Sequence, residues 1–247
     1  MENFFVYFMV AFGWFVGGLV GGATGVGGVM AAMPLLTLVL TPSDAVLVSC
    51  LVGLFGSMQL SIAYHKSCTF KDIRELVIGA VPGCLIGVWI LKIASMQVLQ
   101  IMVCIMIALF VGMQTVQKSS AWRLPDSPLC GLFAGTASGF VNSSVAMVGA
   151  PLGIYALLTQ WTPDRARGNM SVFYMLSGAM TVISQACAGL YTMELVQISA
   201  AGIAGALTGG ELGVRLGRHI DRQMFRRIVI MFLLAAAVIL FVRAVRQ

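Results

Sequence analysis

The sequence predicts an all-α polytopic membrane protein, one that crosses the bilayer many times. Of its 247 residues, 59% are hydrophobic and only 10% are charged, whereas a soluble domain carries roughly 25% charged residues. Because a single soluble core cannot bury so much apolar surface, the composition indicates that lipid surrounds the chain. The apolar residues also fall into runs of the length, about 20 residues, that spans the hydrocarbon as a helix.

The expected elements are about eight full spans and two short segments. The full spans are residues 4–24, 44–65, 74–92, 96–116, 128–142, 167–190, 195–214 and 225–245. The short segments, 27–41 and 145–159, reach only roughly 20–23 Å at about 1.5 Å per residue, less than a hydrocarbon core of about 30 Å. Each follows a cluster rich in Gly, Ser, Thr or Asn and contains a proline, Pro34 or Pro151. We expect a broken or re-entrant helix at each of these places.

The two halves of the chain share residues in the same order, which indicates a duplication. The matching pairs are Gly18 with Gly131, Pro34 with Pro151, Thr41-Pro42 with Thr162-Pro163, Ala45 with Ala166, and Gly83-x-Leu85-x-Gly87 with Gly205-x-Leu207-x-Gly209. We therefore expect two repeats, residues 1–120 and 121–247, in one membrane domain.

The basic residues predict the topology. If each short segment and its predecessor form an even unit, twelve of the 15 Lys and Arg residues lie on one side of the membrane. The positive-inside rule makes that side cytoplasmic and places both termini on the outer, periplasmic side. The two repeats then have opposite orientations. Inverted repeats with paired broken helices are typical of secondary transporters, which bind substrate where the breaks meet.

The two glycine-rich clusters, residues 21–28 and 135–144, are the candidate binding site. A broken helix directs the partial positive charge of its N-terminus into the protein, where it favours an anion. The candidate substrate-binding residues are Thr24, Gly25, Gly27, Gly28, Pro34, Ser138, Asn142, Ser143, Ser144 and Pro151. The alternative is close helix packing through small residues, which we favour for Gly83, Gly87, Gly205 and Gly209.

Ionisable groups within membrane segments are further candidates. Glu211 is either a coupling residue or the partner of Arg215 in an i,i+4 pair. Arg165 either attracts an anion at the cytoplasmic mouth or only records topology, and Asp44 and Asp164 suit helix capping. Six polar residues on segments 44–65 and 167–190 are candidates to line a pathway, namely Gln59, His65, Asn169, Tyr174, Thr181 and Gln185.

The motif Gly21-Gly22-x-x-Gly25-x-Gly27-Gly28 followed by Pro34-Leu35, repeated in degenerate form from Gly135 to Pro151, resembles the TauE/SafE family, the sulfite exporter and toluene-sulfonate uptake permease group. The resemblance covers nearly the whole chain. It implies an inner-membrane carrier of sulfite, sulfoacetate or other organosulfonates. In the second copy Asn142-Ser143-Ser144 stands where the first has Gly27-Gly28, so a shared pocket would take its polar groups mainly from the second copy.

We therefore expect a secondary transporter that moves a small sulfur-containing anion by alternating access, with the lipid bilayer and the anionic solute as partners. We expect no catalytic residues, no metal, no cofactor and no nucleic-acid partner. An anion channel, an intramembrane enzyme and a non-transporting subunit stay open as alternatives, as does a homodimer.

Overall fold

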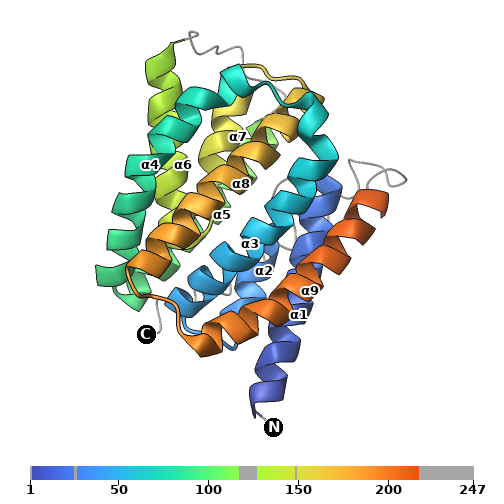
Figure 1. Cartoon of the computed structure of the whole chain (residues 1–247), viewed down its shortest axis with the longest axis vertical. Helices are drawn as coiled ribbons and strands as arrows, with labels where there is room; N and C mark the ends of the chain where they lie inside the picture. Colours follow the sequence, from blue (N-terminus) through green and yellow to red (C-terminus); the bar gives the residue numbers. More distant parts are fainter. Residues whose placement is uncertain (1, 25–26, 117–126, 148, 217–247) are drawn as a thin grey trace.

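The computed structural model describes residues 2–24, 27–116, 127–147 and 149–216, and every regular element in these residues is helical. The helices are α1 (Glu2–Thr24), α2 (Gly28–Leu36), α3 (Pro42–Tyr64), α4 (Phe70–Ile93), α5 (Met96–Val116), α6 (Pro128–Val145), α7 (Gly149–Leu158), α8 (Pro163–Cys187) and α9 (Met193–Leu216), with a 3₁₀ turn, η1 (His65–Ser67), after α3 (Figure 1). Seven expected spans and both short segments are thus helices, and the expected span 225–245 lies outside the described residues.

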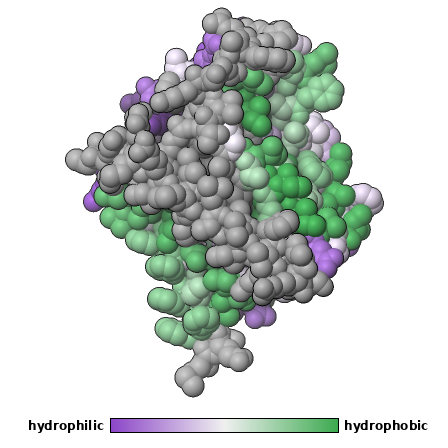
Figure 2. Space-filling model, turned by 180° about the vertical axis from the view of Figure 1, so that it is seen from behind, coloured by the Kyte–Doolittle hydropathy of each residue, from purple (hydrophilic) through white to green (hydrophobic). Residues whose placement is uncertain are grey.

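Five of these helices are long and apolar enough to cross a membrane. They contain the segments Phe4–Ala23, Pro42–Ser67, Phe70–Ile93, Asp164–Cys187 and Met193–Leu216. Large apolar side chains on them face outward, such as Phe4, Ile62 and Trp89. Figure 2 shows hydrophobic residues over most of the coloured surface of the rear face. The chain is therefore a polytopic membrane protein, as the composition predicted.

Helix α3 begins where the sequence predicts a start. Thr41 has extended backbone before the helix, and its hydroxyl oxygen accepts a hydrogen bond from the Asp44 backbone N–H at 3.2 Å. Pro42 occupies the first turn, where no backbone donor is needed. The side chain that caps the backbone is therefore that of Thr41. Asp44 lies in the first turn, and its carboxylate accepts a hydrogen bond from the Thr41 hydroxyl at 2.6 Å. A capping role of the Asp44 side chain itself stays a prediction.

Two helix pairs join the first half of the chain to the second. α1 packs along α9, and α4 packs along α6 (Figure 1). A methyl group on Gly205 would overlap the carbonyl oxygen of Ala11, and one on Gly83 would overlap that of Thr136. The backbones therefore touch directly at these glycines, and the packing role predicted for Gly83 and Gly205 is confirmed.

Helices α3 and α8 pack against each other and lie between these two pairs (Figure 1). α3 also contacts α9, and α8 also contacts α4. The short helix α2 is tucked against α1 and α3, and its residues Met30, Met33 and Leu36 are almost fully buried. The centre of the molecule therefore brings α3, α8 and the two helix breaks together.

Candidate functional site

Both glycine-rich clusters are more helical than the sequence suggested. α1 continues to Thr24, and α6 continues to Val145, so Asn142, Ser143 and Ser144 are helical residues. The hydroxyls of Ser143 and Ser144 donate to the carbonyls of residues 139 and 140 at 3.0 and 2.7 Å. These bonds satisfy the serine side chains inside the helix. Each helix break is therefore only a few residues long.

The two breaks use left-handed backbone. Gly27, just before α2, has φ 86°, a conformation that costs glycine little. Ala146, just after α6, has φ 59° and returns its N–H to the Asn142 carbonyl at 2.9 Å. α2 and α7 then begin afresh. The first N–H groups of a helix have no partner within it, so each new helix presents free donors at its start.

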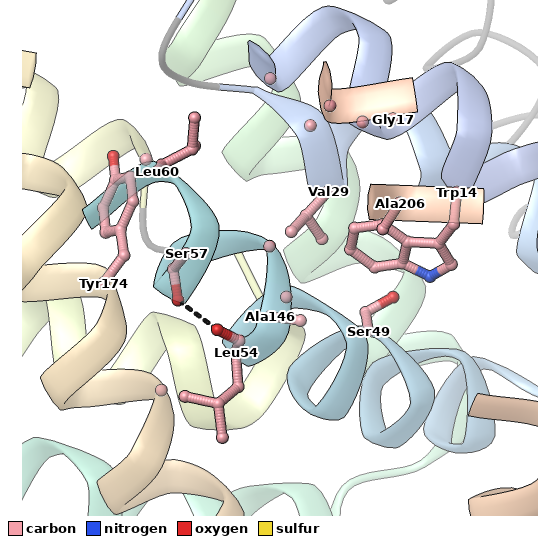
Figure 3. Close-up of a pocket in the computed structure, with 18 of the residues that line it drawn as sticks. Trp14, Gly17, Val29, Ser49, Leu54, Ser57, Leu60, Ala146, Tyr174 and Ala206 are labelled. Atoms are coloured by element: carbon pink, nitrogen blue, oxygen red, sulfur yellow. Dashed lines mark hydrogen bonds between the residues drawn. The ribbon is translucent and has the colours of Figure 1, made fainter. Parts of the chain in front are cut away.

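Both breaks line one pocket, with a volume of about 120 Å³. Its wall includes Gly27 and Gly28 at the start of α2 and Met147 and Gly149 at the α6–α7 break. One water molecule requires roughly 10–15 Å³ of cavity volume on the same measure. The pocket therefore has room for a small ion with some of its hydration water. Figure 3 shows Tyr174 and Trp14 on opposite sides of the pocket.

The pocket offers hydrogen-bond donors without formal charge. Its polar side chains include Ser49, Ser57, Gln59, Asn142 and Tyr174, and no Asp, Glu, Lys or Arg is among its described lining residues. The Tyr174 hydroxyl is buried and has no hydrogen-bond partner among the described residues. It lies 3.8 Å from the position that a Cβ on residue 149 would take. It therefore stands beside the start of α7.

The structure distributes the predicted binding residues unevenly. Gly27, Gly28 and Asn142 lie on the pocket wall. The side chains of Ser138, Ser143 and Ser144 are fully buried but outside that wall. The prolines of the short helices, Pro34 and Pro151, also lie away from it. Thr24 ends α1, while its side chain and all of Gly25 fall outside the described residues.

The chain matches the family model described as "Sulfite exporter TauE/SafE" over residues 10–240, a region that contains both breaks and the pocket. The chain belongs to the TauE/SafE family. No curated protein and no solved structure matched the chain in the other two comparisons. Membership of the TauE/SafE family implies a membrane transporter for sulfite or a related sulfur-containing anion, rather than an enzyme.

In this TauE/SafE protein, α8 holds the end of α6 in place through Thr181. The Asn142 Nδ2 donates to the Thr181 hydroxyl at 3.0 Å, and the Ser143 hydroxyl lies 3.0 Å from the same oxygen. Because Ser143 donates its proton to a backbone carbonyl, Thr181 donates to Ser143 and accepts from Asn142. The amide of Asn142 is thereby fixed at the pocket wall.

One turn further along α8, Gln185 binds the backbone of the same break. Its Nε2 donates to the Ser143 carbonyl at 3.2 Å, and its Oε1 accepts from the Tyr191 hydroxyl at 2.8 Å. Burial raises the pKa of the Tyr191 phenol above its usual value, so this hydroxyl stays protonated and remains a donor.

The ionisable candidates are paired away from the pocket. The Glu211 carboxylate accepts from Arg215 Nε at 3.0 Å at an exposed site, the geometry of an i,i+4 pair. Arg165 donates from Nε and a terminal nitrogen to both carboxylate oxygens of Asp72, each at 2.6 Å. The Asn169 Nδ2 adds a third donor to Asp72 at 3.0 Å. A coupling role for Glu211 and a mouth role for Arg165 stay predictions.

Sequence reasoning did not single out Tyr174 or Gln59, which line the pocket, from the other polar residues of their segments. The expectation that polar groups come mainly from the second copy is not met among the described residues, because Ser49, Ser57 and Gln59 all come from α3. No local signal marks these residues. Which face of α3 meets the breaks depends on the packing of α3 between distant helices.

Proposed function

We propose that this TauE/SafE family member is a secondary transporter that carries sulfite, sulfoacetate or another small organosulfonate across the inner membrane by alternating access. We further propose that the pocket between the two helix breaks is its binding site. The family description names export, and we assign that direction to this chain.

The observation that carries the proposal is that both breaks line the same pocket. Two helix N-termini bring unpaired N–H groups and partial positive charge to one place, and this arrangement favours an anion. The hydroxyl of Tyr174, which has no partner among the described residues, and the amide of Asn142 supply further donors. Pyramidal sulfite and a tetrahedral sulfonate head group each present three acceptor oxygens in different directions, which several convergent donors can bind at once.

Alternating access is supported by the symmetry of the arrangement. We propose that residues 1–120 and 121–247 are inverted repeats, with both termini on the periplasmic side. A long helix, a break and a short helix occur in each half, and the pairing of α1 with α9 mirrors that of α6 with α4. Such repeats exchange conformations when a transporter rocks around a central site.

The proposal is tested by flux into proteoliposomes that contain the purified protein. We expect saturable uptake of radiolabelled sulfite or of one organosulfonate in a panel, with competition among the accepted anions. Uptake that rises linearly with concentration, together with unitary conductance steps, would indicate a channel instead. If no anion of the panel moves faster than into empty liposomes, the substrate assignment is wrong.

Two substitutions test the site itself. Asn142→Ala and Tyr174→Phe each remove one donor from the pocket, and we expect each to weaken anion binding about tenfold, a typical effect of one hydrogen bond to a charged ligand. Ser199→Ala is the matched control, because Ser199 is buried and, in the part of the chain that the structure describes, bonds only to the Leu195 carbonyl of its own helix. Unchanged affinity in both folded variants would place the site elsewhere.

A further inference from the structure

The C-terminal end of α6 carries carbonyl groups that the helix itself does not satisfy. The last four carbonyls of any helix lack partners within it. In α6 the Asn142 carbonyl accepts from the Ala146 N–H at 2.9 Å. The next carbonyl, that of Ser143, accepts instead from the side chain of Gln185 on α8 at 3.2 Å. A single side chain therefore caps α6 at the point where it breaks.

Gln185 is fully buried and does not line the pocket. Its Nε2 lies 3.2 Å from the Ser143 carbonyl and 3.5 Å from the Cys50 Sγ. Its Oε1 accepts the Tyr191 hydroxyl at 2.8 Å. Only one orientation of the amide satisfies all three neighbours, because a carbonyl on the Ser143 side would place two acceptors face to face.

These contacts converge on Asn142 from two directions. Cys50 on α3, which lines the pocket, donates to the Asn142 carbonyl at 3.5 Å. Thr181, four residues before Gln185 on the same helical face, accepts from the Asn142 side chain at 3.0 Å. One face of α8 therefore holds both the side chain of Asn142 and the backbone next to it.

We propose that Gln185 is a positioning residue for the binding pocket: by holding the Ser143 carbonyl it fixes the break in α6 and keeps Asn142 at the pocket wall, while Tyr191 sets the orientation of the Gln185 amide. The inference rests on the proposed function of the pocket. It places a binding determinant outside the pocket and connects it to the α8–α9 loop, in which Tyr191 lies.

The first test measures anion affinity beside stability. Gln185→Met keeps the length of the side chain but removes the amide. We expect it to weaken binding of the accepted anion, with methanesulfonate and sulfite as probes, about tenfold. A lowered unfolding midpoint with unchanged affinity would show a merely structural role and overturn the proposal.

The second test does not depend on the anion. In a variant that retains Cys50 as its single cysteine, Tyr191→Phe should accelerate modification of the Cys50 thiol by a small methanethiosulfonate reagent about fivefold, because it removes the hydrogen bonds of the hydroxyl to Gln185 Oε1 at 2.8 Å and to the Leu47 carbonyl at 3.3 Å. Gln185→Met should accelerate it as well, which separates the bond to Gln185 from the bond to Leu47. Tyr7→Phe is the matched control, because its hydroxyl makes one exposed contact to Gln197 at 3.4 Å. An unchanged modification rate in Tyr191→Phe would overturn the proposal. If the unsubstituted protein binds no anion of the panel, the proposed function fails, and the Cys50 rates alone decide whether Gln185 and Tyr191 hold the break.

Discussion

Thr181 is the residue whose loss should most clearly separate the hydrogen-bond network from the packing around it. Thr181→Val keeps the shape of the side chain and removes the hydroxyl. That hydroxyl binds Asn142 Nδ2 and Ser143 Oγ, each at 3.0 Å, and lies 3.4 Å from the Cys84 thiol. All four residues are buried.

The expected cost follows from what the substitution leaves behind. Ser143 keeps its bond to a backbone carbonyl. Losing its bond to Thr181 therefore costs little stability, roughly the 0.6 kcal/mol average for hydrogen bonds between membrane helices. Asn142 is left with an unsatisfied buried donor, which costs about 1–3 kcal/mol. Because Asn142 lies on the pocket wall, water that enters the pocket would reduce this penalty. We therefore expect the free energy of unfolding to fall by about 1–2 kcal/mol.

Reversible unfolding in mixed micelles with a rising fraction of denaturing detergent measures this change. Thr208→Val is the control, because Thr208 is exposed on α9 and, within the described residues, its hydroxyl bonds only to carbonyls of its own helix, at 2.8 and 3.0 Å. The control should stay within about 0.5 kcal/mol of the unsubstituted protein. Equal free energies of unfolding for Thr181→Val and Thr208→Val would refute the reasoning that the network stabilises the break.

Two further predictions concern the contacts between the halves of the chain. Gly83→Ala should lower the free energy of unfolding by about 3 kcal/mol, because its methyl group would overlap the Thr136 carbonyl oxygen. Gly56→Ala is the control and should change it little, because no atom of the described residues lies within 4 Å of the new carbon. Equal stability of the two variants would show that α4 and α6 can separate freely. Asp72→Asn and Arg165→Ala, made singly and together, should give a coupling energy of about 1 kcal/mol in the same assay. The reason is that the ion pair is bidentate and only partly exposed, with side-chain exposures of 14% for Asp72 and 45% for Arg165. Strictly additive effects would show that the pair does not join α4 to α8.

Several features of the fold could be predicted from local sequence because they depend on neighbouring residues. The apolar runs determine where helices form, and Thr41-Pro42 determines where α3 begins, because the cap uses atoms within three residues of each other. The glycine clusters also marked where α1 and α6 end. The exact positions of the breaks were not predictable, because Ser143 and Ser144 satisfy their hydroxyls within the helix and let α6 continue.

By itself, the sequence determined that the chain is a membrane protein, that it contains paired broken helices and that it resembles the family to which it belongs. The tertiary structure decided which polar groups reach the pocket. Tyr174 and Gln59 line it while Ser143 turns away to Thr181. The physical reason is that a helix presents side chains in all directions, and only contacts between helices distant in the chain select the face that is buried against the breaks.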